Sequence, residues 1–337
     1  MKKISLQKLD VLFAALSEGQ TLYIPAGTPA QFTRWEPGLE MAQCTNTVHS
    51  AKDFFFPQVE NLVDFKVSGK EISIEENRAE DAPFTLFGVR ECDVRSFEIL
   101  DSVFLEEPAD TFYEARRKNG TVITLACNRP AETCFCGSFG LDAANPRGDV
   151  TCWQTEDALY WRANTPKGVT LTQSLTCLED CGDEEVLKKQ EQIREILSRL
   201  PLADVSFASF GKDELMTLFN SPKWDALSES CLGCGTCTFV CPTCQCYDVQ
   251  DFDSGGKVRR FRCWDSCMYS DFTMMAHGTN RPTQKERFRQ RFMHKLVYHP
   301  SNHNGEMGCV GCGRCLQKCP IHMNIVKVAK ALKEDAQ

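Results

Sequence analysis

Short apolar runs alternate with stretches of helical periodicity in the first half of the chain. The runs at 21–25 (TLYIP), 84–89 (FTLFGV) and 121–127 (TVITLAC) are rich in β-branched and aromatic residues and are bounded by Gly, Pro or charged positions, which predicts buried strands. Within residues 90–104, apolar side chains then recur at helical spacing, at Val94, Phe97, Leu100 and Phe104. A strand that leads into a helix in this way predicts an α/β domain with mixed or parallel strand pairing.

Three further stretches have the pattern of helices. Residues 1–20 contain two lysines and no long apolar run, which is typical of an amphipathic helix rather than of a signal peptide. Residues 184–200 (EEVLKKQEQIREILSRL) place charged residues at outer positions and end before Pro201, and residues 212–231 lead into a cysteine-rich segment. The last two stretches predict a helical connector. No stretch has the roughly 18 apolar residues that a membrane span requires.

Length and charge narrow the class of protein. The chain has 337 residues, 42% of them hydrophobic and 25% charged, and a net charge of −8. This length predicts two domains, and the acidic balance argues against general nucleic-acid binding. One segment is an exception, because ten Lys or Arg residues but only three acidic residues lie between Lys257 and Lys295. We interpret it as the solvated face of a helix, with a docking patch as the alternative.

Twenty cysteines change this picture. Such a number forms a disulfide scaffold in short secreted chains, whereas a long intracellular chain uses its cysteines to bind metal. Because no signal peptide is apparent, we expect a cytoplasmic protein whose thiols are reduced unless a metal binds them. Residues 1–185 contain eight cysteines, and residues 231–319 contain the other twelve. The second group therefore predicts a metal-binding domain.

The cysteine-rich part contains an internal repeat, CLGCGTCTFVCP at 231–242 and CVGCGRCLQKCP at 309–320. Each copy has the spacing C-x2-C-x2-C-x3-C-P, in which the first three cysteines bind one [4Fe–4S] cluster and the fourth binds the other cluster. The spacing therefore predicts two clusters with crossed ligands. The predicted ligands are Cys231, Cys234, Cys237 and Cys319 for one cluster, and Cys309, Cys312, Cys315 and Cys241 for the other.

A pair of zinc knuckles is the alternative interpretation of this repeat. Zinc takes four ligands from two C-x2-C pairs and has no use for a third cysteine at the same spacing. Glycines recur between the cysteines of both copies, where they allow backbone N–H groups to approach cluster sulfurs. These glycines are Gly233, Gly235, Gly311 and Gly313. Both features favour iron–sulfur clusters over zinc.

Segments around the motifs resemble a known family. They are GVRECD and TLACNRPAETCFCGSFG in the first half, and CPTCQCYDV and FRCWDSCMYSDFTMMAHGTNRPTQKERFRQRFMHK between the motifs. These segments resemble the iron–sulfur electron-transfer subunit of anaerobic sulfite reductase and, equally, the β subunit of sulfhydrogenases, which are cytosolic NiFe hydrogenases. The resemblance implies a subunit that carries electrons between a flavoprotein subunit, which binds FAD and NAD(P)H, and a catalytic subunit. That catalytic subunit would be a siroheme sulfite reductase or a NiFe hydrogenase.

The resemblance also implies a third cluster in the first half of the chain. Its ligands would be Cys92, Cys127, Cys134 and Cys136, in which the C-x6-C-x-C spacing of the last three is similar to the family pattern. Cys127 closes one predicted strand and Cys92 follows another, and α/β folds build sites at such strand ends. Buried, inert cysteines are the alternative.

Eight cysteines are left over. Cys244, Cys246 and Cys267 match family positions, and Cys263 lies beside them. They either bind a fourth cluster or shield the first two as small apolar side chains, and the sequence leaves both possibilities open. We interpret the remaining four as structural, namely Cys44, Cys152, Cys177 and Cys181.

No G-x-G-x-x-G follows a predicted strand, so we expect no dinucleotide site in this chain. The sequence thus predicts an α/β domain at 1–185, a helical connector at 186–228 and a mostly α-helical, dicluster ferredoxin-like domain at 229–337. We expect a non-catalytic electron-transfer subunit, preferably of an anaerobic sulfite reductase, with the β subunit of a NiFe (sulf)hydrogenase as the alternative. Two other hypotheses are a catalyst that acts at a cluster near Cys92 and a nucleic-acid-binding protein.

Overall fold

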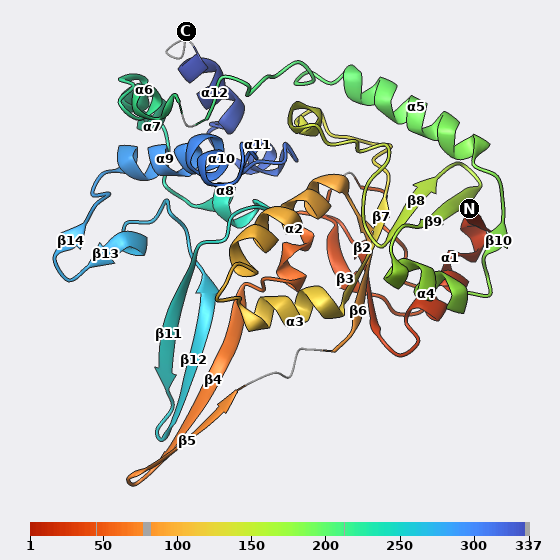
Figure 1. The fold of residues 1–337 in the computed structure, drawn as a ribbon, viewed down its shortest axis with the longest axis horizontal. Coiled ribbons are helices and arrows are strands. Elements are labelled where there is room, and N and C mark those ends of the chain that lie inside the picture. Colours follow the sequence, from red (N-terminus) through yellow and green to blue (C-terminus); the bar gives the residue numbers. More distant parts are fainter. Residues whose placement is uncertain (45, 77–81, 212, 334–337) are drawn as a thin grey trace.

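A mixed sheet of eight strands forms the centre of the first half of the chain in this computed structural model, which describes residues 1–44, 46–76, 82–211 and 213–333 (Figure 1). The strand order is β10-β1-β9-β8-β7-β6-β2-β3. Strands β2, β6, β7 and β8 run parallel to their neighbours in this group, and the other pairings are antiparallel. The strands are β1 (Lys2–Ser5), β2 (Thr21–Ala26), β3 (Gln31–Arg34), β6 (Phe84–Val89), β7 (Gly120–Leu125), β8 (Val150–Gln154), β9 (Ala158–Ala163) and β10 (Glu179–Asp180).

The three strands predicted from apolar runs are confirmed as β2, β6 and β7, and they are parallel neighbours. The helix predicted after the second run is confirmed as α2 (Glu91–Phe104). The amphipathic helix expected at 1–20 is wrong for its first residues, because these form strand β1 and the helix α1 is confined to Leu9–Leu16. Ile4 explains the difference, since its buried side chain belongs to the core while its backbone pairs with β9.

Helices cover both faces of the sheet. Helix α1 and Leu171 of α4 (Pro166–Ser174) pack with Leu22 and Ile24 of β2. On the other face, α2 and α3 (Thr111–Asn119) pack against β6 and β7 around Phe97 and Tyr113. Helix α5 (Glu184–Ser198), which the sequence predicts at 184–200, packs with Trp153 of β8. The sheet thus buries both faces and presents the ends of β6 and β7 to the rest of the chain.

The C-terminal part is built from short helices around a separate apolar core (Figure 1). The helix predicted at 212–231 is two helices interrupted at residues 220–222, and Lys212 lies outside the described residues. Helix α9 continues through a π-helical turn, His294–Tyr298, into α10. The helices are α6 (Leu215–Phe219), α7 (Lys223–Glu229), α8 (Thr236–Phe239), α9 (Gln284–Met293), α10 (His299–Asn302), α11 (Arg314–Lys318) and α12 (Ile325–Lys333).

A second, antiparallel sheet joins the two halves of the chain. Its order is β11-β12-β4-β5, so that each half supplies one hairpin. The prediction of a mostly helical C-terminal domain is not confirmed, because residues 247–264 form the hairpin β11–β12 and a smaller hairpin, β13–β14, follows. Residues 334–337 of that predicted domain lie outside the described residues. The strands are β4 (Val59–Ser68), β5 (Glu71–Glu76), β11 (Tyr247–Asp253), β12 (Lys257–Trp264), β13 (Met274–Met275) and β14 (Gly278–Thr279).

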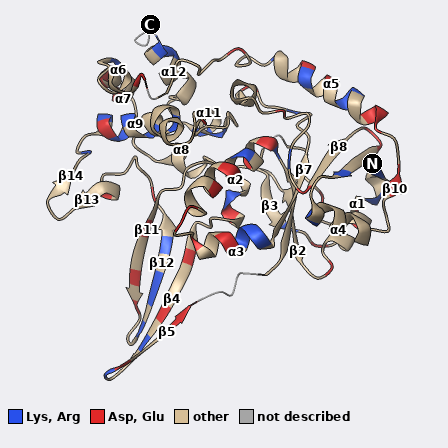
Figure 2. Cartoon of the chain, viewed as in Figure 1, with Lys and Arg blue, Asp and Glu red and all other residues tan. Residues whose placement is uncertain are grey.

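The expectation of a solvated helix face in the basic segment is wrong for residues 257–264, because they form strand β12 and its basic side chains make ion pairs across this sheet. Figure 2 shows basic β12 between β11 and β4, both of which carry acidic residues. Arg260 pairs with Asp251 at 2.7 Å, and the buried Arg262 pairs with Glu60 at 2.5 Å. Asp64 of β4 pairs with two more basic residues of β12, Lys257 and Arg259. These charges have partners within the chain and need no nucleic acid to balance them.

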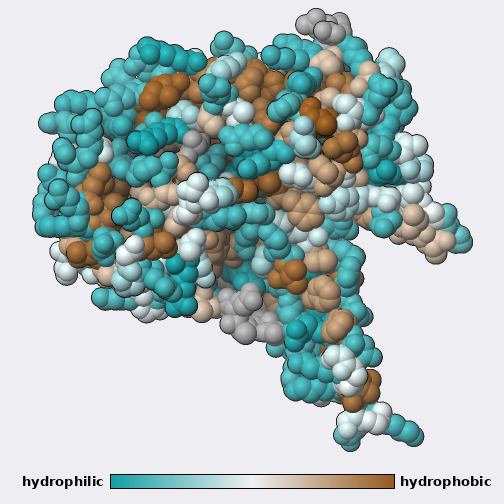
Figure 3. Space-filling view, turned by 180° about the vertical axis from the view of Figure 1, so that it is seen from behind, coloured by the Kyte–Doolittle hydropathy of each residue, from teal (hydrophilic) through white to brown (hydrophobic). Residues whose placement is uncertain are grey.

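The outer end of the second sheet projects from the body (Figures 1 and 3). Ile72 and Ile74 of β5 are 66% and 64% exposed there. Their pairing with Val67 and Phe65 places all four side chains on one face of the sheet. Exposed apolar faces of this kind mark interaction surfaces. In the described part of the chain, no helix is both long and apolar enough to span a membrane.

Candidate iron–sulfur sites

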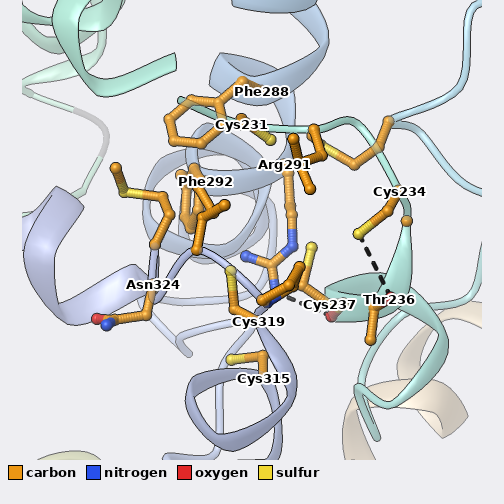
Figure 4. A pocket seen from close by; sticks show the side chains of 16 residues that line it. Cys231, Cys234, Thr236, Cys237, Phe288, Arg291, Phe292, Cys315, Cys319 and Asn324 are labelled. Atoms are coloured by element: carbon orange, nitrogen blue, oxygen red, sulfur yellow. Dashed lines mark hydrogen bonds between the residues drawn. The ribbon is translucent and has the colours of Figure 1, made fainter. Parts of the chain in front are cut away.

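The first site is a pocket between the start of the first motif and the end of the second. Figure 4 shows Cys231, Cys234, Cys237 and Cys319 directed toward a common space that also holds the Arg291 side chain. The four thiols that the crossed spacing assigns to one cluster therefore line one pocket, although they lie far apart in the sequence.

The second site is a pocket directly beside the first. Its lining includes Cys241 of the first motif together with Cys309, Cys312 and Cys315 of the second. These are the four thiols that the spacing assigns to the other cluster. Cys315 also lines the first pocket, so the two pockets share a wall. Each pocket thus takes cysteines from both motifs.

Left-handed glycines shape the loops that carry these thiols. In Gly235 and Gly311, φ is +70° and +62°, a backbone conformation that is costly for other residues. A Cβ atom on Gly311 would lie 2.5 Å from the carbonyl oxygen of Phe135. The turns direct backbone N–H groups toward sulfur, since Gly311 donates to the thiol of Cys309. Such N–H···S bonds orient and tune cluster ligands.

The predicted N-terminal ligands gather beside the second pocket. Cys127 follows β7, and its thiol interacts electrostatically with those of Cys134 and Cys136. Cys92, in the first turn of α2, is near Cys136 and packs against Cys312 of the second motif. All four N-terminal thiols are buried. We call Cys92, Cys127, Cys134 and Cys136 the N-terminal thiol group.

Backbone contacts hold this group against the second motif. The Phe135 N–H donates to the Gly311 carbonyl at 2.9 Å. The Cys134 thiol lies 3.8 Å from the Cys312 carbonyl oxygen, which also accepts from Asn46 at 3.1 Å. Because the loops touch directly, the N-terminal thiol group and the second pocket are immediate neighbours.

Buried cations without carboxylate partners test whether these sites fit a negatively charged group. Arg291 and Lys295 are 3% and 4% exposed. Among the described residues neither lies within 4.0 Å of a carboxylate, and the Nε atom of Arg291 is buried without a hydrogen-bond partner. An uncompensated buried charge is costly. Thiolates bound to iron would balance both cations, so the residues present fit clusters.

The placement of the thiols also distinguishes an iron–sulfur cluster from a single metal ion. No three His, Cys, Asp or Glu side chains in the described ranges converge on one metal ion. Zinc requires such convergence, because its thiolate ligands lie about 2.3 Å from a single atom. In a [4Fe–4S] cluster each cysteine binds a different iron, so the thiols surround a space instead. The two pockets match this second arrangement.

Burial controls the protonation of these thiols. Burial raises the pKa of Cys134, Cys136 and Cys309 to about 12, so they are protonated at neutral pH when no metal is bound. Cys234 differs, because hydrogen bonding with Thr236 lowers the pKa of its exposed thiol. Iron binding at the buried thiols therefore releases protons.

Sequence reasoning missed several residues of these sites. Lys295 donates to the Thr243 hydroxyl at 2.6 Å, and this hydroxyl lies 3.3 Å from the thiol of Cys241. The π-helical turn that begins at His294 positions Lys295, and such turns occur frequently at functional sites. Cys44, interpreted as structural, lies near Cys127. A lysine in an amphipathic segment carries no signal of burial, so only the fold reveals its role.

Comparisons with known proteins agree with this geometry. Residues 230–323, which include both motifs, match the family described as a 4Fe-4S dicluster domain. The chain is 35% identical over 293 residues to sulfhydrogenase 2 subunit beta of Pyrococcus furiosus, and this alignment covers 86% of this chain and 84% of the relative. No solved structure matches the chain significantly. This protein therefore belongs to the family of iron–sulfur β subunits of sulfhydrogenases.

Proposed function

We propose that this chain is the electron-transfer subunit of a cytoplasmic, sulfhydrogenase-type complex. It would connect a flavoprotein subunit that binds FAD and NAD(P)H to a NiFe catalytic subunit. The sequence alone favours a sulfite reductase complex and names the hydrogenase as the alternative. The name of the Pyrococcus furiosus relative, a sulfhydrogenase subunit, supports this alternative over the siroheme enzyme.

The observation that carries the proposal is the serial arrangement of the three thiol sites. The N-terminal thiol group contacts the second pocket through Cys312, and the second pocket shares Cys315 with the first. The proposed ligands are Cys92, Cys127, Cys134 and Cys136, then Cys309, Cys312, Cys315 and Cys241, then Cys231, Cys234, Cys237 and Cys319. Clusters held there would supply one-electron transfer. The protein's own part is to hold the three sites in contact and to supply buried positive charge.

The first pocket is the end of this series nearest the surface. Cys234 is exposed, whereas the other nineteen cysteines are buried or half-buried. Leu232, next to it, is 67% exposed and lines an open groove with Met274. Exposed apolar residues beside the outermost site suit contact with a partner subunit, since permanent interfaces are apolar.

Iron and acid-labile sulfide analysis of the anaerobically purified chain tests the proposal. The three proposed clusters, with four thiolates each, require at least about twelve irons per chain, and a Cys92→Ser variant should lose roughly four irons. Cys44→Ser is the matched control, because Cys44 also lies near Cys127 but is not a proposed ligand. Eight irons in the wild type would remove the N-terminal site from the proposal.

Reduction experiments test the partners. The isolated chain should not be bleached by NADH, because no dinucleotide fingerprint is present in the sequence. Adding the flavoprotein subunit should allow NADH to bleach it. Metal analysis of the complex purified from its source then identifies the catalytic subunit: nickel supports the hydrogenase, and a siroheme absorption spectrum contradicts it.

A further inference from the structure

Three cysteines outside the proposed ligand sets form a cluster of their own. Cys244 and Cys246 precede β11, and Cys267 follows β12. The register of this hairpin pairs Tyr247 with Trp264, so the residues just outside it come together. The side chains of Cys246 and Cys267 are hydrogen-bonding neighbours, and Cys267 also interacts electrostatically with Cys244. We call Cys244, Cys246 and Cys267 the insertion thiol group.

This group lies directly beside the second pocket. The Cys244 side chain is a hydrogen-bonding neighbour of Cys241, the ligand that the first motif contributes to that pocket. Cys263 is different, although it is close in sequence. Its electrostatic neighbours are the carboxylates of Asp248 and Asp265, and no thiol is among them. The hairpin therefore collects three thiols and leaves the fourth apart.

Two buried lysines face this group. The Nζ atom of Lys52, a residue that is 2% exposed, donates to the Cys244 carbonyl at 2.7 Å and lies 3.7 Å from the centre of the Trp264 ring. The thiols of Cys244 and Cys241 are the leading favourable electrostatic partners of Lys52, and Cys241 and Cys244 are those of Lys295. Among the described residues neither lysine forms a salt bridge with a carboxylate. Two buried lysines thus lie beside the insertion thiol group and beside Cys241 of the first motif.

The chemistry of the donors limits what would balance these charges. A set of only thiolates selects soft ions, which in proteins means zinc or iron–sulfur clusters. A structural zinc site requires four converging ligands, and the described residues offer three thiols that do not converge on one ion. We propose that Cys244, Cys246 and Cys267 bind a further iron–sulfur cluster next to the second pocket, with Lys52 and Lys295 balancing its charge. Each thiol releases its proton as it binds iron.

Such a site changes the layout of the chain. The second pocket then has three neighbouring sites: the first pocket, the N-terminal thiol group and the insertion thiol group. With three cysteines for a four-iron cluster, one iron is left without a thiolate from the described residues. An iron without a thiolate is the one most easily lost on oxidation, so this site should convert to a three-iron form before the others do.

The test compares iron and sulfide contents of anaerobically reconstituted wild type, Cys246→Ser/Cys267→Ser and Cys263→Ser. We expect about sixteen irons in the wild type and in the Cys263→Ser control, and roughly a quarter fewer in the double variant. Equal iron in all three proteins would overturn the proposal, as would zinc that is present in the wild type and lost from the double variant. A disulfide between Cys246 and Cys267 in the reconstituted wild type would also overturn it.

A second measurement tests the proposal even if the double variant does not fold. Mild oxidation of the wild type should produce the EPR signal of a three-iron cluster, and Lys52→Met should shift the midpoint potential of that signal downward without removing the other clusters. No such signal in the oxidised wild type would contradict the proposal. The inference rests on the proposed function only in treating the chain as an iron–sulfur protein. A wild type with twelve irons that loses four in Cys92→Ser and none in Cys246→Ser/Cys267→Ser contradicts the further site alone, whereas a wild type without iron contradicts both proposals.

Discussion

Arg314 donates two hydrogen bonds to the carboxylate of Asp93, at 2.7 and 2.8 Å, and both side chains are 2% exposed. Arg314 begins α11, directly after the glycines of the second motif, and Asp93 lies in the first turn of α2, next to Cys92. This pair therefore joins the N-terminal thiol group to the second pocket across 221 residues of sequence.

Asp93→Asn should destabilise the protein strongly. The substitution leaves the Arg314 guanidinium buried without its counter-charge, which costs about 3–5 kcal/mol in comparable buried pairs. Denaturant unfolding of the anaerobic protein measures the loss. The double variant Asp93→Leu/Arg314→Met should recover much of it, because neither charge remains. A double variant as unstable as the single one would show that the ion pair is not the source of the effect.

Gly311→Ala should disturb the junction between the N-terminal thiol group and the second motif. The alanine would need a left-handed backbone, and its Cβ would lie 2.5 Å from the Phe135 carbonyl oxygen. We expect a cost of at least about 2 kcal/mol and a loss of iron. Gly137→Ala is the matched control, because a Cβ there has no neighbour within 4 Å. Thermal unfolding and iron analysis compare the two. Equal behaviour of both variants would contradict the close contact.

Lys295→Met should lower a reduction potential. A buried cation favours the reduced, more negative state of a nearby cluster, so its removal should shift the midpoint downward by on the order of 100 mV. Redox titration followed by EPR measures the shift. Lys285→Met is the control, because it also removes a lysine of this helical segment. Lys285 is partly exposed and pairs with Asp225, so the cluster potential should be unchanged in this variant. Equal shifts in both variants would argue against a role for Lys295.

Paired cysteine variants test the crossed ligation. Cys319→Ala and Cys231→Ala both damage the first pocket, so their combination should lose little more iron than either alone. Cys319→Ala combined with Cys309→Ala damages both pockets and should lose the iron of two clusters. EPR spectra and iron counts distinguish these results. If the losses had the reverse order, each motif would bind its own cluster and the crossed scheme would be wrong.

Leu232→Glu should slow electron exchange with a partner subunit without removing iron. Its side chain is 67% exposed beside Cys234, and a carboxylate there would oppose an apolar contact. We expect at least a tenfold lower rate, equivalent to about 1.4 kcal/mol. Leu187→Glu on α5 is the control, since Leu187 is 57% exposed and lies on a different element. Stopped-flow reduction by the flavoprotein partner measures both. An unchanged rate for Leu232→Glu would place the contact elsewhere.

Some of this structure was predictable because its signals are local in the sequence. The three parallel strands appear as apolar runs, and the motif spacing groups the thiols as the two pockets do, except that Cys315 lines both pockets. The β11–β12 hairpin was missed because all seven residues of β11 are exposed and its first partner outside the hairpin is β4, almost 200 residues earlier in the chain. The burial of Arg262 was missed for the same reason, since its buried partner Glu60 lies on that distant strand.

The residues that balance charge at the sites were not predictable for a similar reason. Lys52, Arg291 and Lys295 lie in segments whose sequences are typical of an amphipathic helix or a loop. Their burial depends on a π-helical turn, on the second sheet and on loops from both halves of the chain. These contacts join distant parts of the chain, so no local sequence pattern predicts them, whereas cysteine spacing is a local pattern.

The mixed composition of the two pockets constrains how the protein matures. Cys241 precedes Cys319 by 78 residues, and domains fold from the N-terminus as the chain leaves the ribosome. The α/β sheet is therefore complete while the cysteines of the first motif still lack their partners from the second. Both pockets close only when the last residues of the second motif have been synthesised. Iron insertion is consequently a late event, and a chain interrupted before residue 309 exposes a row of unprotected thiols to oxidation.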